Sequence, residues 1–229
     1  TDMDPITQQA VLATAGAAGA GGALYVDDVF SPFLYTGNNT TNVINNGIDL
    51  AGEGGLVWAK CRNNSSASNG PHSLWDTERG TRQYLVPNTT AASYVIAAQY
   101  SQYGLQSFNS NGFTLGINWA YENNPSNVGD DMVSWTFRKA PGFFDIVTYT
   151  GNGTAGRTVA HNLGSVPGMI IVKCTSISDS WTIYHRGLGA TKAIYFNDDT
   201  SHTNTGFWND TEPTSTQFTV GNTGAVNAT

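Results

Sequence analysis

Charge is scarce in this chain. Charged residues make up 12% of its 229 residues, against about 25% in an average soluble domain, and its 10 lysines and arginines are scattered. Nucleic-acid binding depends on clustered cations that displace counterions from phosphates, and a net charge of −7 works against it. We therefore expect no nucleic-acid partner.

Long apolar runs and a cysteine framework are also missing. No stretch approaches the roughly 20 apolar residues of a membrane-spanning helix, so the sequence predicts no membrane span. The N-terminus lacks the basic segment, apolar core and cleavage site of a secretory signal. The two cysteines, Cys61 and Cys174, could form at most one disulfide, which excludes a disulfide scaffold.

What the sequence does have is an internal repeat. Four segments of the first half match four segments of the second half in the same order: 35–38 with 149–152, 55–61 with 168–174, 74–82 with 183–192, and 112–116 with 217–221. The first pair repeats Tyr-Thr-Gly-Asn unchanged, and the second pair ends in Lys-Cys both times. Four matches in one order indicate that one structural unit occurs twice.

The repeat bears on the cysteines. Cys61 and Cys174 are two copies of one position at the end of an apolar segment. We expect each to be a free thiol that packs in its core as a small hydrophobic side chain. A disulfide between the copies is the alternative.

Both copies are predicted to be β-structure. Short segments rich in β-branched and aromatic residues are separated by Gly, Asn, Ser and Pro, and in the first copy they lie at 33–36, 56–60, 83–86, 113–115 and 133–137. We expect an all-β fold of tandem β-sandwich repeats, jelly-roll or concanavalin-like. The repeats span 29–140 and 141–229 and join at the Pro-Gly of 141–142.

The second copy is predicted to lack its last strand. In the first copy a strand over 132–137 follows Gly116, and the same step after Gly221 leads beyond Thr229. Because an unpaired sheet edge favours association, we expect the polypeptide to continue or another chain to supply the strand.

Residues 1–28 differ from both copies and are interpreted as an anchor. A carboxylate followed by proline is typical of a helix start, and we expect a short helix over 7–13 before a run rich in glycine and alanine. Such a short helix is marginal alone, so it needs a protein surface. The residues assigned to the anchor are Asp4, Pro5, Ile6, Val11 and Leu12.

One cluster invites a catalytic interpretation. Asp76, Glu78 and Arg79 could form an acid/base pair with a cation beside it. The second copy carries His, Gly and Leu at these positions, so a turn role is favoured. We assign no catalytic residue.

Metal sites are not indicated. No Cys-x-x-Cys occurs in the sequence. The four histidines lack metal-ligand spacing: His72, His161, His185 and His202. The pairs Asp130-Asp131 and Asp198-Asp199 are interpreted as turn formers, with calcium as the alternative. We assign no metal and no cofactor.

Loop aromatics of the first copy are the stronger candidates for binding. They lie in an insertion relative to the second copy: Tyr94, Tyr100, Tyr103, Trp119 and Tyr121. Flat aromatic faces stack on sugars, and loops on a rigid scaffold are common binding sites. The alternative is that the rings pack under their own loop or against a neighbouring subunit.

Several longer motifs carry a family resemblance. They are Asn-Gly-Ile-Asp-Leu at 46–50, Gly-Gly-Leu-Val-Trp-Ala-Lys at 54–60, Asp-Thr-Glu-Arg-Gly at 76–80, Phe-Asn-Ser-Asn-Gly-Phe at 108–113, the run 135–145, and in the second copy 149–156 and 161–164. Together they resemble the repeat of marine phage tail-fibre and tail-associated proteins over about residues 24–229.

The resemblance implies a virion structural protein that is not an enzyme. It implies a tail fibre or tail-attached adhesin that docks to other virion proteins by its N-terminus, forms a homo-oligomer, expected to be a trimer, and contacts a host surface glycan or protein. Such a protein belongs to the virion and is assembled in the host cytoplasm. The alternative is a capsid decoration or head-fibre protein, and a third interpretation is a free carbohydrate-active enzyme.

Overall fold

The computed structural model describes residues 24–63, 72–117, 123, 131–196, 201–203 and 205–229. Short strands dominate it, so the predicted all-β class is confirmed. The first half contains η1 (Val26–Asp28), β1 (Phe30–Thr36), β2 (Asn42–Asn45), β3 (Gly55–Cys61), β4 (Ser73–Asp76), β5 (Gln83–Tyr84), β6 (Tyr94–Val95), η2 (Ala98–Tyr100), β7 (Leu105–Asn109), β8 (Gly112–Leu115) and β9 (Asp131–Arg138). The second half contains β10 (Arg157–Ala160), β11 (Met169–Val172), β12 (Thr182–His185), β13 (Lys192–Tyr195), β14 (His202–Thr203), α2 (Thr205–Trp208), β15 (Gln217–Val220) and α3 (Gly224–Asn227).

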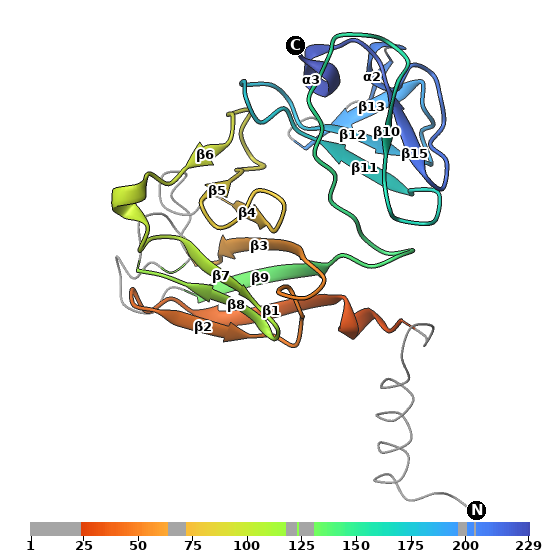
Figure 1. The fold of residues 1–229 in the computed structure, drawn as a ribbon. Helices are drawn as coiled ribbons and strands as arrows, with labels where there is room; N and C mark the ends of the chain where they lie inside the picture. The colour runs from red at the N-terminus through yellow and green to blue at the C-terminus, as the bar shows by residue number, and fades with distance from the viewer. Residues whose placement is uncertain (1–23, 64–71, 118–122, 124–130, 197–200, 204) are drawn as a thin grey trace, which may run out of the picture.

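Two antiparallel sheets share the core of the first half (Figure 1). One has the strand order β1-β9-β3-β4 and the other β2-β8-β7. Because alternate side chains of a strand point to one face, Val57 of β3 and Phe113 of β8 lie in one buried cluster with Trp75 of β4. The small pair β5-β6 lies beside these sheets.

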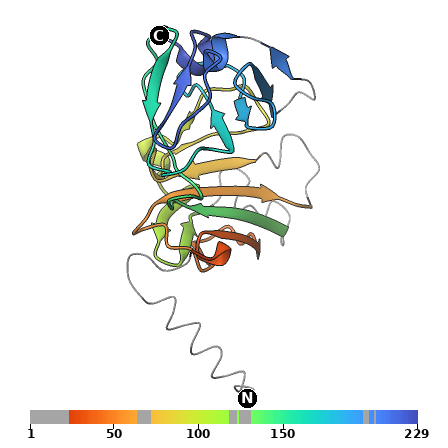
Figure 2. The same cartoon turned by 90° about the vertical axis from the view of Figure 1, so that its right-hand side faces the viewer.

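In the described part of the second half, the pairs β11-β12 and β10-β15 match β3-β4 and β2-β8 of the first half. The sheets of the second half are β11-β12-β13-β14 and β10-β15. Val172, Tyr184 and Phe218 lie in its core, at positions that match Ala59, Trp75 and Phe113 of the first half. Viewed after a quarter turn, the two halves are stacked one above the other (Figure 2).

A buried asparagine ties the first half together. The side-chain oxygen of Asn123 accepts a hydrogen bond from the amide of Asn38 at 3.0 Å. Its Nδ2 donates to the carbonyls of Thr40 and Gly116, at 2.7 Å each. The whole amide group is thereby satisfied, which matters because an unpaired buried polar group costs about 1–3 kcal/mol.

Asn227 makes the same contacts in the second half. It accepts from the amide of Asn152 at 2.9 Å and donates to the carbonyls of Thr154 and Gly221 at 2.9 and 2.8 Å. We call Asn123 and Asn227 the clamp asparagines. Neither was predicted from the sequence; the available signal was an asparagine six or seven residues after the last glycine of the fourth matched segment.

Packing around the matched Tyr-Thr-Gly-Asn is also shared. Tyr35 meets Phe113 edge-on with ring centroids 6.4 Å apart, and Tyr149 meets Phe218 edge-on at 6.2 Å. The two halves therefore use matching residues for matching contacts.

A turn over 140–144 connects the halves. The amide of Ala140 donates to the carbonyl of Phe144 at 2.9 Å, and Gly142 has a φ of +76°, which glycine adopts easily. The Gly142 amide donates to the carbonyl of Leu163 at 2.7 Å. The Pro-Gly of the predicted join lies in this turn.

Main-chain hydrogen bonds also link the halves away from the turn. The amide of Ser93 donates to the carbonyl of Thr175 at 2.9 Å, and the amide of Asp179 donates to the carbonyl of Thr90 at 2.8 Å. Two loops are thus held side by side.

Trp181 of the second half inserts into the first. It is buried against Leu74 and Leu85, and its indole N–H donates to the carbonyl of Thr89 at 3.0 Å. Burying an aromatic side chain with its polar atom satisfied is a strong contact, so the two halves are firmly coupled.

The cysteine expectation is half wrong. Both thiols are free, but Cys61 is buried whereas Cys174 is partly exposed. Cys61 lies opposite Met132 of β9 in the sheet register, and the described part of the second half has no strand in that place. The missing cover explains the difference.

Two sequence predictions cannot be compared with the fold. The N-terminal helix and the anchor residues Asp4, Pro5, Ile6, Val11 and Leu12 lie outside the described residues. Among the described helices, none has the length and apolar character needed to span a membrane.

Candidate recognition surface

Tyr94 ends a stack of aromatic rings that reaches the core of the first half. β5 pairs with β6 so that Tyr84 lies opposite Tyr94, and their rings stack with centroids 5.1 Å apart and planes 16° apart. Tyr84 in turn packs on Trp75 at 4.7 Å. Tyr94 is 42% exposed, so it presents one end of a supported stack to solvent.

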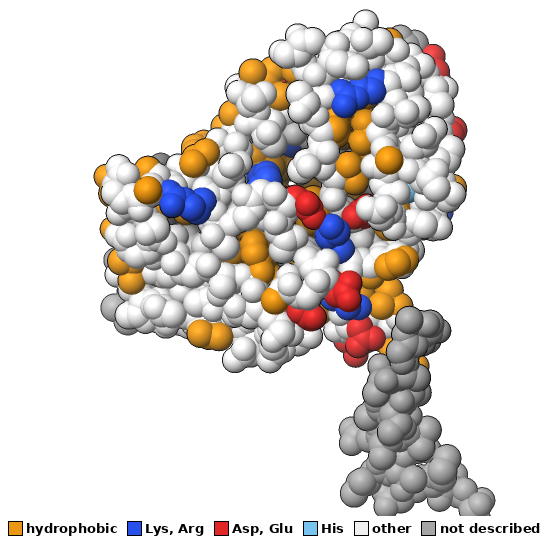
Figure 3. All heavy atoms as spheres, viewed as in Figure 1, with side chains coloured by type: hydrophobic (Ala, Val, Ile, Leu, Met, Phe, Trp, Pro, Cys, Tyr) orange, Lys and Arg blue, Asp and Glu red, His pale blue; other side chains and the backbone are white. Residues whose placement is uncertain are grey.

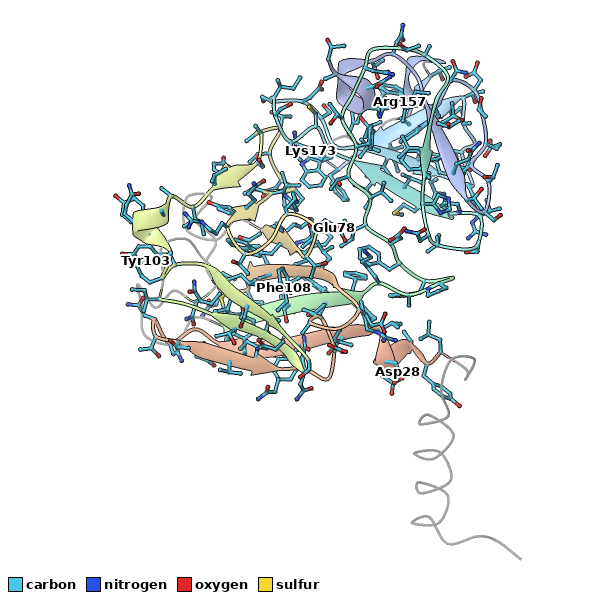
Figure 4. All side chains as sticks on the ribbon, in the orientation of Figure 1. Asp28, Glu78, Tyr103, Phe108, Arg157 and Lys173 are labelled. Atoms are coloured by element: carbon cyan, nitrogen blue, oxygen red, sulfur yellow. The ribbon has the colours of Figure 1, made fainter. Side chains whose placement is uncertain are left out.

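A second aromatic pair follows on the same segment. Tyr100 of η2 and Tyr103 have ring centroids 6.0 Å apart, and Tyr100 is 37% exposed. The loop that carries them is fastened by Arg82, whose Nη2 donates to the carbonyl of Ile96 at 2.6 Å. Tyr103 lies at the outer end of the first half (Figure 4).

We call Tyr94, Tyr100 and Tyr103 the tyrosine surface. The structure places these three predicted residues on one short segment between β5 and β7. Trp119 and Tyr121 lie outside the described residues.

The second half uses the matching interval differently. Between β13 and β15 it has α2, whose Phe207 and Trp208 are buried in the core. Trp208 meets Tyr184 edge-on at 5.9 Å. Aromatic side chains thus turn inward in the second half and partly outward in the first.

The surroundings are mostly uncharged. On the face shown in Figure 3, many acidic and basic side chains lie near the junction of the halves and beside the N-terminal segment, basic ones also lie at the left end and at the upper right, and most of the remaining surface is neutral. Exposed phenol rings with one arginine, Arg82, hydrogen-bonded to the same loop suit a ligand that stacks and accepts or donates hydrogen bonds, such as a sugar or a peptide.

A small pocket lies between the halves. Trp58, His72, Pro87, Asn88 and Phe196 line a volume of about 140 Å³. The indole N–H of Trp58 donates to Nδ1 of His72 at 2.8 Å, and burial, aided by Lys60, lowers the pKa of His72. The pocket therefore offers a neutral imidazole among apolar rings, with room only for a small group.

Residues 26–229 match the family described as Domain of unknown function (DUF7483). The chain belongs to DUF7483. The match covers both halves, so the family's shared region includes the pair of units rather than a single one. No curated protein and no solved structure matches the chain.

Within the DUF7483 region, the candidate acid/base pair serves a turn. The Arg79 amide and Nε donate to the two carboxylate oxygens of Asp76 at 2.9 and 2.6 Å. Glu78 forms a separate ion pair with Lys139 at 2.7 Å, which raises the pKa of Lys139. The two carboxylates have different partners, as expected for residues that fix a turn.

The described residues bring no metal-ligand cluster together. No group of three or more His, Cys, Asp or Glu side chains lies within ligand range in the described ranges. Asp130, Asp198 and Asp199 of the alternative calcium pairs are outside those ranges.

Proposed function

We propose that this DUF7483 chain is a structural protein of a tailed-phage particle, a tail fibre or tail-attached adhesin. In this proposal the N-terminal segment docks to other virion proteins, and the two β units display a recognition surface to the host. The location is the virion, after assembly in the host cytoplasm. The observation that carries the proposal is an exposed tyrosine surface on one unit of a firmly coupled, duplicated framework.

Coupling of the two units supports a display role. The clamp asparagines fix each unit internally, while Trp181 and the paired loops fix the units to each other. Binding residues work best on loops held by a rigid scaffold, because little entropy is then lost on binding. The stalk of a tail fibre must also be rigid.

Differences between the units support a recognition role for the tyrosine surface. Positions shared by both units serve packing, as Tyr35 and Tyr149 do. Tyr94 and Tyr100 belong to the segment that is not shared and are partly exposed. We propose a host surface glycan or protein as the ligand of this surface.

The finer fold and the assembly are part of the proposal. We propose that each unit is a β-sandwich, jelly-roll or concanavalin-like, and that the chain forms a homotrimer. Leu34 of β1 and Val43 of β2 are exposed apolar residues on edge strands, where subunit contacts form readily. No catalytic step and no cofactor are proposed.

A capsid decoration or head-fibre protein is the second candidate. The same exposed edges of β1 and β2 favour it, since shell proteins pack side by side. In that role the units would stabilise the shell and the tyrosine surface would contact a neighbouring subunit.

Location on the particle separates the two candidates. Particles of the phage that encodes the chain would be labelled with gold at a tag on the chain's N-terminal segment. Gold at the tail is expected, whereas gold over the whole head would replace the adhesin proposal with the decoration protein. Absence of the chain from purified particles would refute both.

Ligand binding tests the tyrosine surface. Binding of the purified chain to host cells or a glycan array should fall about tenfold in Tyr94→Ala and Tyr100→Ala, since a lost ring stack is worth about 1–2 kcal/mol. Tyr25→Ala, a change at an exposed tyrosine of the first half outside this surface, is the matched control. Steady turnover of a glycan that Asp76→Asn abolishes would contradict the non-enzymatic proposal.

A further inference from the structure

Among the described strands, β11 has a neighbour on one edge and none on the other. In the first half, β3 pairs with β4 on one side and with β9 on the other. Its counterpart β11 pairs with β12 alone among the strands in the described part of the chain. The second half thus has a sheet edge that the first half covers.

The hydrogen-bond pattern identifies which amides face this edge. The Arg186 amide donates to the carbonyl of Gly168 at 2.9 Å, so Gly168 is bonded toward β12. Antiparallel pairs alternate, which directs the main-chain groups of Met169 and Ile171 the other way. Their first-half counterparts are Leu56 and Trp58, which pair with Phe137 and Trp135 of β9.

The strand on the far side of β9 also has a counterpart. In the first half β1 pairs with β9, and Phe33 and Tyr35 of β1 pack on the core. In the second half Val147 and Tyr149 pack on the core in the same way. Their segment, 146–150, belongs to no strand pair in the described residues. Both neighbours of a β9-type strand are therefore present, and no strand of the described residues is paired between them.

Exposure agrees with a missing cover. Met169 is 53% and Ile171 is 44% exposed, whereas Trp58 is partly buried and packs on Trp135 of β9 at 5.7 Å. Cys174 is partly exposed, while Cys61 is buried.

The open edge of β11 also lacks the residues that usually prevent an edge strand from pairing with another chain. Natural edges are blunted by charged residues or proline, and the Met-Ile-Ile-Val of β11 has neither. Lys173 follows directly, but its Nζ is turned back to the carbonyl of Cys174 at 2.6 Å. An apolar edge of this kind is suited to accept a strand.

We propose that β11 is the acceptor for an extended β9-like strand, in which small polar and large aromatic residues alternate, inserted antiparallel between β11 and segment 146–150 as β9 is in the first half. Main-chain bonds to Met169 and Ile171 supply affinity, and side-chain alternation supplies selectivity. The inference stands independently of the proposed function.

β9 specifies the chemistry of the donor. Ser134 and Thr136 are fully buried toward the core, so small polar residues are required on the inner face. Trp135 and Phe137 point the other way, where the matching donor residues would cover Ile171 and Met169. The donor is thus a segment in which small polar and large aromatic residues alternate.

A synthetic peptide with the sequence of residues 130–139 is the probe. Cys174 of the full chain would be alkylated with and without this peptide, and modification followed by peptide mapping. At a peptide concentration about ten times the dissociation constant, alkylation of Cys174 should slow about tenfold. Cys61, buried in the same molecule, and a scrambled peptide serve as controls.

Two variants test the geometry. Ile171→Pro removes an amide that faces the open edge, where an edge strand tolerates proline, and should abolish protection while the chain stays folded. Ile171→Lys should do the same by placing a charge on the edge, with Ile177→Lys as the matched change at an exposed loop residue.

Three results would overturn the inference. Peptide at millimolar concentration could leave the alkylation of Cys174 unchanged. Cys174 could be as protected as Cys61 before any peptide is added. Protection could instead follow chain concentration alone, in which case a second copy of the chain covers the edge.

Discussion

Between matching strands, the first half of the chain carries Tyr94 and Tyr100 at its surface, whereas the second half turns Phe207 and Trp208 into its core. The matching interval thus carries partly exposed aromatic rings in the first half and buried ones in the second. By contrast, the clamp asparagines keep the same three contacts in both. Shared positions hold the framework, and unshared loops are free to differ.

A second difference concerns completeness. β3 has neighbours on both sides and β11 has one in the described residues. The edges of the first half include β1 and β2, whereas in the described part of the second half β11, the counterpart of the interior strand β3, is itself an edge strand. Comparison of the two copies therefore separates residues that serve folding from those available for recognition or assembly.

The largest expected effect comes from removing a clamp asparagine. Asn123→Ala and Asn227→Ala each leave main-chain groups unpaired in a buried place, which should lower the free energy of unfolding by about 3–5 kcal/mol. Urea denaturation measures it. The exposed Asn45→Ala and Asn222→Ala are matched controls and should change stability by less than about 0.5 kcal/mol. If the two substitutions lowered the free energy of unfolding by clearly different amounts, the two clamp asparagines would not be equivalent.

Uncoupling the halves should have a smaller effect. Trp181→Phe removes the hydrogen bond to the Thr89 carbonyl and part of the buried ring, at a cost of about 1–3 kcal/mol. Calorimetry should then show a broader transition, because the two halves melt less cooperatively. Ile177→Ala, at an exposed residue nearby, is the control. An unchanged single sharp transition would argue that the interface does not couple the units.

Stability should fall at alkaline pH because of Tyr149 in the second half. Burial raises the pKa of Tyr149 to about 12, and its hydroxyl donates to the carbonyl of Val226 at 2.6 Å. An unfolded tyrosine ionises near pH 10. The contribution of Tyr149 to the free energy of unfolding is therefore complete below pH 10 and is lost as pH rises toward 12.

Tyr149→Phe tests that pH dependence. It should lower stability at pH 8 by about 1 kcal/mol, through the lost hydrogen bond, and flatten the decline between pH 10 and 12. The exposed Tyr25→Phe should leave the pH profile as it is. The slope of unfolding free energy against pH is the measurement, and an unchanged slope in Tyr149→Phe would contradict burial of this hydroxyl.

The sequence predicted the strands well because their pattern is local. Gly55–Cys61 alternates in burial along its length, and Asp131–Arg138 is rich in apolar, aromatic and β-branched residues, so both patterns can be seen in the residues themselves. The repeat also predicted a cysteine at the end of a strand in each half, which holds for Cys61 of β3, while Cys174 lies two residues beyond β11. Both are consequences of residue order alone.

The clamp asparagines and the fate of Cys174 could not be found in this way. Asn123 acts on Asn38, 85 residues away, and its role depends on three main-chain groups that only the folded chain brings together. Cys174 looks like Cys61 in sequence, but its exposure depends on a neighbouring strand. Local patterns specify strands, and partners across the fold decide burial.

Amide hydrogen exchange at β3 and β11 tests the central claim most directly. If the second unit is the first without its β9, then Met169 and Ile171 should exchange quickly while Ile170 and Val172 are protected, and Leu56 and Trp58 should exchange only with global unfolding. Equal protection of Met169 and Ile171 with Leu56 and Trp58 would contradict the account, because it would mean that the edge of β11 is already paired.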